Sequence, residues 1–310
     1  MMGFNDLVAG AVTRGIGFMD DATRHKIADK MSARQAASDH EFAETVVHNL
    51  TTVFPAMSKA NIQNLALLNC KRMARARLDH LWSWHASARE LAALASLSGA
   101  KELPGNSACI IVGCHQLGME VAAMRLSVEV EGAIVVDPGS ETLLGAAKRA
   151  WSRFRPQTII EAEGAFRPAL RVLKAGKPLL LFPDEPEIAG HHRVPAQVIG
   201  AMVQYSPIVS ILAKAAAAPV FWLQVDQQAD GHYRVSLEQL AAATEAVDMH
   251  KTIQMQAKKL EEFLRTDPSA YWWSRRRLAA ARSRAGYGLA GAKRRQVQQE
   301  QVSRSLIAAS

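Results

Sequence analysis

A chain of 310 residues with 49% hydrophobic and 21% charged residues has ordinary globular composition, and its length suits one large or two small domains. Its three cysteines, Cys70, Cys109 and Cys114, lack CxxC spacing, so the sequence suggests neither a disulfide framework nor a zinc site and fits a reducing cytoplasm. The net charge of +8 comes entirely from residues 271–310, because residues 1–270 carry 28 basic and 28 acidic side chains.

Residues 4–19 are predicted to form an amphipathic helix, with hydrophobic side chains at i, i+3, i+4 spacing from Phe4 to Met19. Such a helix lies either in a membrane interface or against the protein core, and the pattern fits both. No stretch approaches the roughly 20 apolar residues that span a bilayer, and the N-terminus lacks the features of a signal peptide. We therefore expect a protein that is neither secreted nor transmembrane.

The pattern from residue 21 to about 100 is helical, with good helix formers and few glycines. Pro55, which follows NLTTVF, separates two helical blocks. We expect residues 1–103 to form an N-terminal helical region that caps or supports a second domain.

After Pro104, short apolar runs alternate with helical patterns. The predicted strands are 107–114, 132–137, 158–160, 178–182, 218–225 and 233–237, and the predicted helices are 119–128, 140–154, 165–175, 206–217 and 245–265. This alternation predicts an α/β domain over residues 104–277, with a largely parallel sheet flanked by helices. Ligands of such domains collect at the carboxyl ends of the strands.

His115 directly follows the first of these strands, and Glu120 lies five residues later. Five residues on one helix rotate by about 140°, so the two side chains can meet only if His115 lies in the turn and Glu120 in the first helical turn, with Gly118 easing the bend. Glu120 would then hold one ring nitrogen while the other accepts a proton from a hydroxyl. The spacing alone is weak evidence, because His85 and Glu90 share it within a predicted helix, and a histidine near a core is usually structural.

Residues 278–310 form a basic tail rich in Ala and Gln. It suggests contact with an anionic surface, such as acidic phospholipid, an acidic carrier protein or nucleic acid; a solvated disordered tail is the alternative. No nucleic-acid recognition motif is present in the body, and we expect no nucleic acid partner. Trp272 and Trp273, just before the tail, are either a membrane-interface anchor or part of the core.

Neither a metal nor a cofactor is expected. His191 and His192 follow Asp184, Glu185 and Glu187 too closely for the facing pairs that metal sites use, and the chain has no P-loop or G-x-G-x-x-G motif.

Three segments resemble the bacterial lipid A biosynthesis (late) acyltransferases, of the lauroyl/myristoyl type, in the same order and at similar distances. HNLTTVFP (48–55) is similar to the family's N-L-x-x-x-F-P segment, and HQLGME (115–120) is similar to its H-x4-D/E motif. DPSAYWWSRRR (267–277) is similar to its closing P-x-x-Y-x-W-x-H-R-R segment. The resemblance covers about residues 45–277.

The resemblance implies a glycerolipid acyltransferase-like fold and an enzyme without a metal or cofactor. Such an enzyme moves a fatty acyl chain from a thioester, on acyl carrier protein or else on coenzyme A, to a hydroxyl of a membrane lipid such as a lipid A precursor. It would act as a peripheral protein at the cytoplasmic face of the bacterial inner membrane.

The resemblance also implies roles for five residues. His115 would be the general base and Glu120 its orienting partner, Arg153 and Arg155 would hold an acceptor phosphate or the developing oxyanion, and Asp184 would be an acidic residue of the site. A solvated helix face is the alternative for the arginines, and a helix cap or turn is the alternative for Asp184.

Three departures from the family pattern leave the acceptor open. Ser274 replaces the histidine of the closing motif, residues 198–200 read Val-Ile-Gly instead of Phe-Phe-Gly, and Pro186 interrupts an acidic pair. A lysophospholipid, glycolipid, aminolipid or pigment alcohol is an alternative acceptor. A non-catalytic relative that binds lipid or carrier protein is the alternative function.

Overall fold

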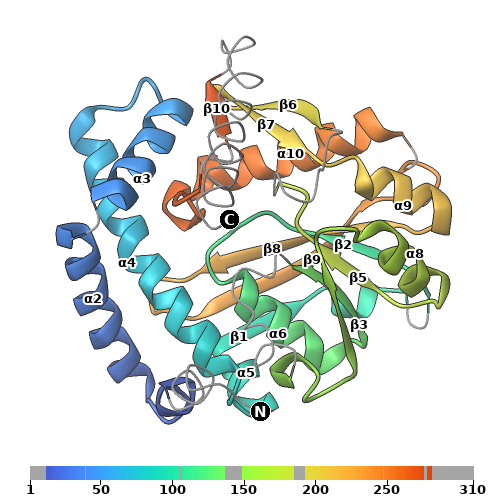
Figure 1. Cartoon of the computed structure of the whole chain (residues 1–310), viewed down its shortest axis with the longest axis horizontal. Helices are drawn as coiled ribbons and strands as arrows, with labels where there is room; N and C mark the ends of the chain where they lie inside the picture. The colour runs from blue at the N-terminus through green and yellow to red at the C-terminus, as the bar shows by residue number, and fades with distance from the viewer. Residues whose placement is uncertain are drawn as a thin grey trace, which may run out of the picture.

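The computed structural model of the chain describes residues 12–38, 40–104, 107–136, 149–184, 193–246, 248–275 and 278–280. Three helices form one flank of the molecule (Figure 1): α2 (Asp21–Ser38), α3 (His40–Val53) and α4 (Lys59–Ser83). The longest, α4, begins at the N-cap Ser58, whose side chain accepts a hydrogen bond from the backbone N–H of Asn61. Among the described residues, no helix has both the length and the hydropathy of a membrane span.

The centre of the molecule is a seven-stranded sheet with the order β1-β9-β8-β2-β5-β3-β4. Only the pairing of β8 with β9 is antiparallel, so the prediction of a largely parallel sheet is confirmed. The strands are β1 (Ala95–Ser98), β2 (Ile110–Val112), β3 (Gly132–Val136), β4 (Gln157–Glu161), β5 (Leu179–Leu181), β8 (Val220–Gln227) and β9 (Tyr233–Ala241).

Both faces of the sheet are covered, which explains why its central strands are continuous apolar runs. In β2, Ile110 and Val112 face one core while Ile111 faces the other. The first core also contains α8 (Phe166–Lys174), α9 (Ile208–Ala216) and α10 (Met249–Thr266). The second core contains α4, α5 (Ala88–Leu94) and α6 (Met119–Glu129).

The structure differs from the sequence prediction in two places. β1 lies within the stretch predicted to be helical, and it joins the edge of the main sheet by pairing with β9. A second, three-stranded sheet was not predicted; it has the order β10-β7-β6 and consists of β6 (Val194–Val198), β7 (Ala201–Tyr205) and β10 (Leu278–Ala280). Leu50 and Val53 of α3 belong to the same core as the sheet, so the N-terminal helices pack as part of one body with the α/β region.

The predicted helix at 4–19 lies partly outside the described residues, and residues 12–17 are helical. Thr13 and Ile16 are buried, whereas Phe18, in the turn that follows, is 89% exposed. This end of the segment therefore packs partly on the protein and partly presents apolar surface to solvent. Most of the predicted helix 140–154 and the tail beyond 280 lie outside the described residues.

Candidate active site

Two neighbouring strands bring His115 and Asp184 together. β2 and β5 pair in parallel, with Val112 opposite Leu181. His115 and Asp184 each follow the last paired residue of their strand by three positions, so both lie at the same carboxyl edge of the sheet. His115 Nδ1 lies 2.8 Å from Asp184 Oδ1.

The Asp184 carboxylate also accepts two further hydrogen bonds, both through Oδ2. The backbone N–H of His115 donates one at 3.0 Å, and the hydroxyl of Tyr271 donates the other at 2.9 Å. His115, Asp184 and Tyr271 are 8%, 1% and 0% exposed. A buried carboxylate held in this way fixes the ring orientation of the histidine and favours the tautomer that is protonated at Nδ1, so proton exchange with a substrate falls to Nε2.

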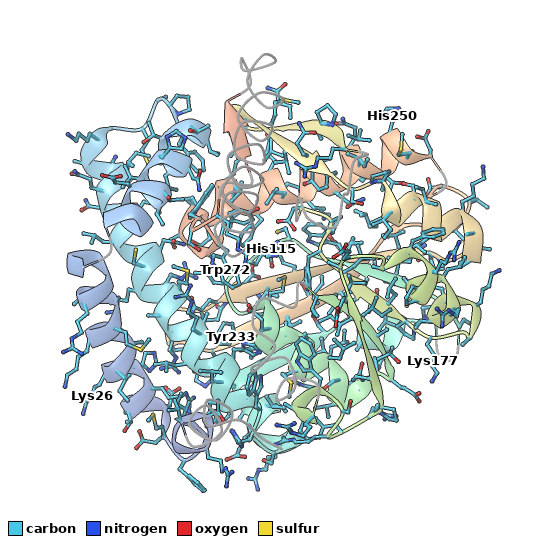
Figure 2. The ribbon with its side chains drawn as sticks, viewed as in Figure 1. Lys26, His115, Lys177, Tyr233, His250 and Trp272 are labelled. Atoms are coloured by element: carbon cyan, nitrogen blue, oxygen red, sulfur yellow. The ribbon has the colours of Figure 1, made fainter. Side chains whose placement is uncertain are left out.

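The chain near the C-terminal end runs antiparallel beside the histidine segment. Leu117 N donates to Ala270 O at 2.6 Å, and Trp272 N donates to His115 O at 2.9 Å. The Trp272 ring centroid is 6.3 Å from that of His115, and Figure 2 shows the two side chains next to each other. Hydrogen bonds between distant segments therefore place Tyr271 and Trp272 at the site.

The N-terminal helices hold this same segment through two buried asparagines. Asn49 Nδ2 donates to the carbonyl of Trp273 at 2.6 Å, and Asn69 Nδ2 donates to that of Tyr271 at 2.7 Å. The Trp273 ring is fully buried and lies edge-on to Phe54, with the centroids 6.3 Å apart. The three segments that carry the family resemblance are thus assembled around one site, and Trp273 belongs to the core.

Glu120 lies in the first turn of α6, as predicted, and the helix begins after Gly118. Gly118 has a φ of 89°, and a Cβ at this position would overlap the ring of Tyr233, so the turn requires glycine. Among the described residues, however, Asp184 is the carboxylate that bonds to the His115 ring, and no hydrogen bond or ion pair joins Glu120 to His115. The Glu120 charge instead raises the pKa of Arg77 and of His80 on α4, although burial lowers both more strongly.

Arg153 and Arg155 are not brought to His115. Arg153 Nη1 donates to the carbonyl of Trp84 at 2.7 Å, just beyond the end of α4, and Arg155 Nε donates to that of Val128 at 3.0 Å. Val128 lies near the end of α6 that is remote from His115, a helix length of roughly 15 Å away. Both arginines bond to backbone carbonyls at the ends of helices, which is a structural role.

The pair with the same spacing as His115 and Glu120 has a structural explanation. His85 lies in the turn after α4, outside the helix in which we predicted it. Glu90 closes a capping box at the start of α5, where its Oε2 accepts a hydrogen bond from Ser87 N at 2.7 Å. This carboxylate is engaged in capping and does not bond to His85.

Tyr205, at the end of β7, was not identified from the sequence. Its hydroxyl is buried and has no hydrogen-bond partner in the described part of the chain. Burial raises the pKa of Tyr205 well above its ordinary value, and the nearby Asp184 and Cys114 raise it further. Tyr205 therefore remains protonated beside Asp184 at neutral pH. No sequence signal pointed to it, because the three-stranded sheet itself was not predicted.

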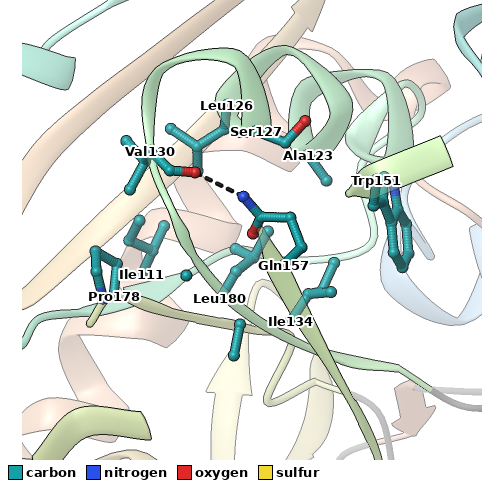
Figure 3. A pocket seen from close by; sticks show the side chains of 12 residues that line it. Ile111, Ala123, Leu126, Ser127, Val130, Ile134, Trp151, Gln157, Pro178 and Leu180 are labelled. Atoms are coloured by element: carbon teal, nitrogen blue, oxygen red, sulfur yellow. Dashed lines mark hydrogen bonds between the residues drawn. The ribbon is translucent and has the colours of Figure 1, made fainter. Parts of the chain in front are cut away.

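A small pocket lies at the other edge of the sheet, away from His115 (Figure 3). It is lined by Leu126 and Val130 near the end of α6 and by the amino ends of β3 and β5, and Gln157 Nε2 donates to Val130 O at 2.7 Å. Its Trp151 side chain has a buried Nε1 without a partner in the described residues. None of the residues that line it is His115, Asp184, Tyr271 or Trp272.

No group of three or more His, Cys, Asp or Glu side chains within the described ranges is arranged to hold a metal ion. His191, His192, Glu185 and Glu187 lie outside those ranges. The three cysteines are buried and form no disulfide, and burial raises the pKa of Cys109 to about 12.

Residues 5–280 match the family model described as bacterial lipid A biosynthesis acyltransferase. Among solved structures, the chain is similar to the crystal structure of the 1-acyl-sn-glycerophosphate acyltransferase from Thermotoga maritima. The similarity has a TM-score of 0.39 and 11% sequence identity, and it covers 79% of this chain and 97% of that one. No curated protein sequence matches the chain. Because the family model spans most of its length, the chain belongs to the bacterial lipid A biosynthesis acyltransferase family and is an enzyme that transfers acyl groups.

Proposed function

We propose that the protein transfers a fatty acyl chain from a thioester to a hydroxyl of a membrane lipid, with His115 as the general base and Asp184 as its orienting carboxylate. The observation that carries this proposal is the 2.8 Å contact between His115 Nδ1 and Asp184 Oδ1 at the carboxyl edge of the sheet. Burying a carboxylate against a histidine costs free energy, and a protein that only binds lipid would gain no function from that arrangement.

The mechanism is direct transfer. His115 Nε2 takes the proton of the acceptor hydroxyl as its oxygen attacks the thioester carbonyl, and Asp184 stabilises the imidazolium that forms. The tetrahedral intermediate then breaks its carbon–sulfur bond, and the imidazolium returns the proton to the departing thiolate. The products are an ester and a free thiol, with no acyl group attached to the enzyme.

The donor we propose is acyl carrier protein, with acyl-CoA as the alternative, and the acceptor is a lipid A precursor. The family supports acyl transfer to a lipid, but the departures at Ser274 and residues 198–200 keep a lysophospholipid, glycolipid, aminolipid or pigment alcohol as alternative acceptors.

We further propose that the protein acts as a peripheral protein at the cytoplasmic face of the inner membrane. The exposed Phe18 would insert at the interface, and the +8 charge of residues 271–310 would meet anionic headgroups.

The function is tested with purified protein and radiolabelled acyl-acyl carrier protein or acyl-CoA, offered with a lipid A precursor or with a lysophospholipid. A labelled, acylated lipid A precursor is the expected product. Transfer to the lysophospholipid alone would change the acceptor, and no transfer with any pair would contradict the proposal. The same reactions with the two donors identify the carrier.

A further inference from the structure

Three arginines lie close together on α4, and two of them are engaged by the protein. Arg72 Nη1 donates to both carboxylate oxygens of Asp267, at 2.8 and 2.6 Å. Arg75 Nε donates to Asp79 Oδ2 at 2.6 Å. Arg77 forms no hydrogen bond or ion pair with any described residue, so the five N–H donors of its guanidinium have no described acceptor.

The Arg77 guanidinium lies beside the active site. Its central carbon is 5.9 Å from the ring centroid of Trp272, and the centroid of the His115 imidazole is 6.3 Å from that of the same indole. Met73, Ala76 and Leu117 form a buried cluster against which the Trp272 indole packs. Figure 2 shows Trp272 beside His115 on the side that faces α4.

Arg77 is accessible to solvent, yet desolvation by surrounding protein is the largest influence on its pKa and lowers it. The Arg77 side chain can therefore be reached by a ligand, while nearby protein atoms desolvate part of it. It stays charged at neutral pH, because an arginine pKa is far above 7. Glu120 attracts it without forming an ion pair, so a bound anion would compete only with this longer-range attraction.

We propose that Arg77 binds a phosphate group of a substrate, with the Trp272 ring, which also lies beside His115, as the platform that positions the guanidinium at the edge of the active site. This inference rests on the proposed function. A guanidinium fork matches a phosphate through two parallel hydrogen bonds, and stacking on an indole limits the freedom that the side chain loses on binding. The phosphate belongs either to the pantetheine arm of the thioester donor or to a phosphorylated lipid acceptor.

The test compares Arg77→Gln with the wild type, and Lys71→Gln is the matched control. Lys71 is also an exposed cation of α4, but it pairs with Asp29 at 3.0 Å and away from the site. The experiment has two arms. In the donor arm, acyl-phosphopantetheine is compared with acyl-pantetheine, and in the acceptor arm, the acceptor lipid is compared with the same lipid without its phosphate. Arg77→Gln is expected to raise KM roughly 10- to 100-fold for the phosphate-bearing member of one arm, with kcat changed less than about threefold.

The phosphate-free member of that arm should be used equally well by wild type and Arg77→Gln, and Lys71→Gln should behave like the wild type throughout. The arm that responds identifies the source of the phosphate. If Arg77→Gln keeps the wild-type preference for phosphate in both arms, or if the wild type has none, the inference is overturned.

A binding measurement separates this outcome from a failure of the proposed function. Phosphopantetheine and pantetheine are titrated calorimetrically into wild type and Arg77→Gln, as is glucosamine 1-phosphate against glucosamine. Weaker binding of a phosphate-bearing probe by Arg77→Gln supports the subsite even if no acyl transfer is detected. Equal binding by the two proteins, or no binding of either phosphate probe, overturns it whatever the activity.

Discussion

Replacing Asp184 with asparagine changes the His115 site in a way that can be derived from its hydrogen bonds. Asp184 Oδ2 accepts from two donors, the His115 backbone N–H and the Tyr271 hydroxyl. In Asp184→Asn, the amide oxygen must face these two donors, so the amide NH₂ faces His115 Nδ1. The imidazole then accepts a hydrogen bond at Nδ1 and carries its proton on Nε2, which is the wrong tautomer for a base.

The substitution also removes the charge that stabilises the imidazolium. Two unit charges about 4 Å apart interact by about 4 kcal/mol at an effective dielectric constant of about 20. That energy corresponds to a factor of roughly 10³ in rate, within the range of about 10²–10⁴ that is typical for loss of general acid–base catalysis. We therefore expect Asp184→Asn to lower kcat about 10³-fold while the KM for the donor changes little.

Glu120→Gln is the variant with which Asp184→Asn is compared, because it removes the other carboxylate that the sequence placed beside His115. Because no hydrogen bond or ion pair joins Glu120 to His115, we expect kcat to fall less than about tenfold in this variant. Initial rates at saturating donor and acceptor, with circular dichroism to confirm folding, measure both variants. A loss of about 10³-fold in Glu120→Gln, with Asp184→Asn near the wild type, would refute the assignment and restore Glu120 as the orienting partner.

The remaining predictions concern positioning, stability and membrane binding. Tyr271→Phe should lower kcat about tenfold by removing one hydrogen bond to Asp184, and a rate equal to that of the wild type would contradict this prediction. The control is Tyr233→Phe, which breaks a 3.0 Å hydrogen bond to the remote Asp79 and should lower only the Tm. Arg153→Ala should lower the free energy of unfolding by about 1 kcal/mol in urea titrations without raising the acceptor KM, whereas a raised KM would show that Arg153 binds substrate. Deleting residues 286–310 removes four basic residues and should weaken sedimentation with anionic vesicles at least tenfold at low salt; equal binding would show that the tail is passive.

The main sheet could be predicted because its central strands carry their signal locally. Residues 110–112 and 179–181 are buried on both faces, so each is an unbroken apolar run. The strand β1 was missed because it has only four residues and continues directly from α5, which is too short a run to establish a strand period. The hairpin β6–β7 was missed because β6 contains Pro195, a residue that argues against a strand when only the sequence is considered.

The His115 site could be predicted in part. A histidine at the end of a buried strand is visible in the sequence, and Asp184 was expected to be at the site. Their direct pairing depends on β5 being the neighbour of β2, which no local pattern encodes. The position of Arg153 could not be predicted for the same reason, because the charge of an arginine does not reveal at which edge of the sheet it lies. Arg77 was overlooked because it lies on a helix about 40 residues before His115 and is close to it only in space.

The most direct test of the account is the rate of acyl transfer by His115→Ala. With acyl-acyl carrier protein and the accepted lipid, this variant should lose at least about 10²-fold in rate while its circular dichroism spectrum stays that of the wild type. His85→Ala, which removes a histidine outside the site, should stay within a few-fold of the wild type. Acyl transfer by His115→Ala at the wild-type rate would contradict the central claim that His115 is the catalytic base.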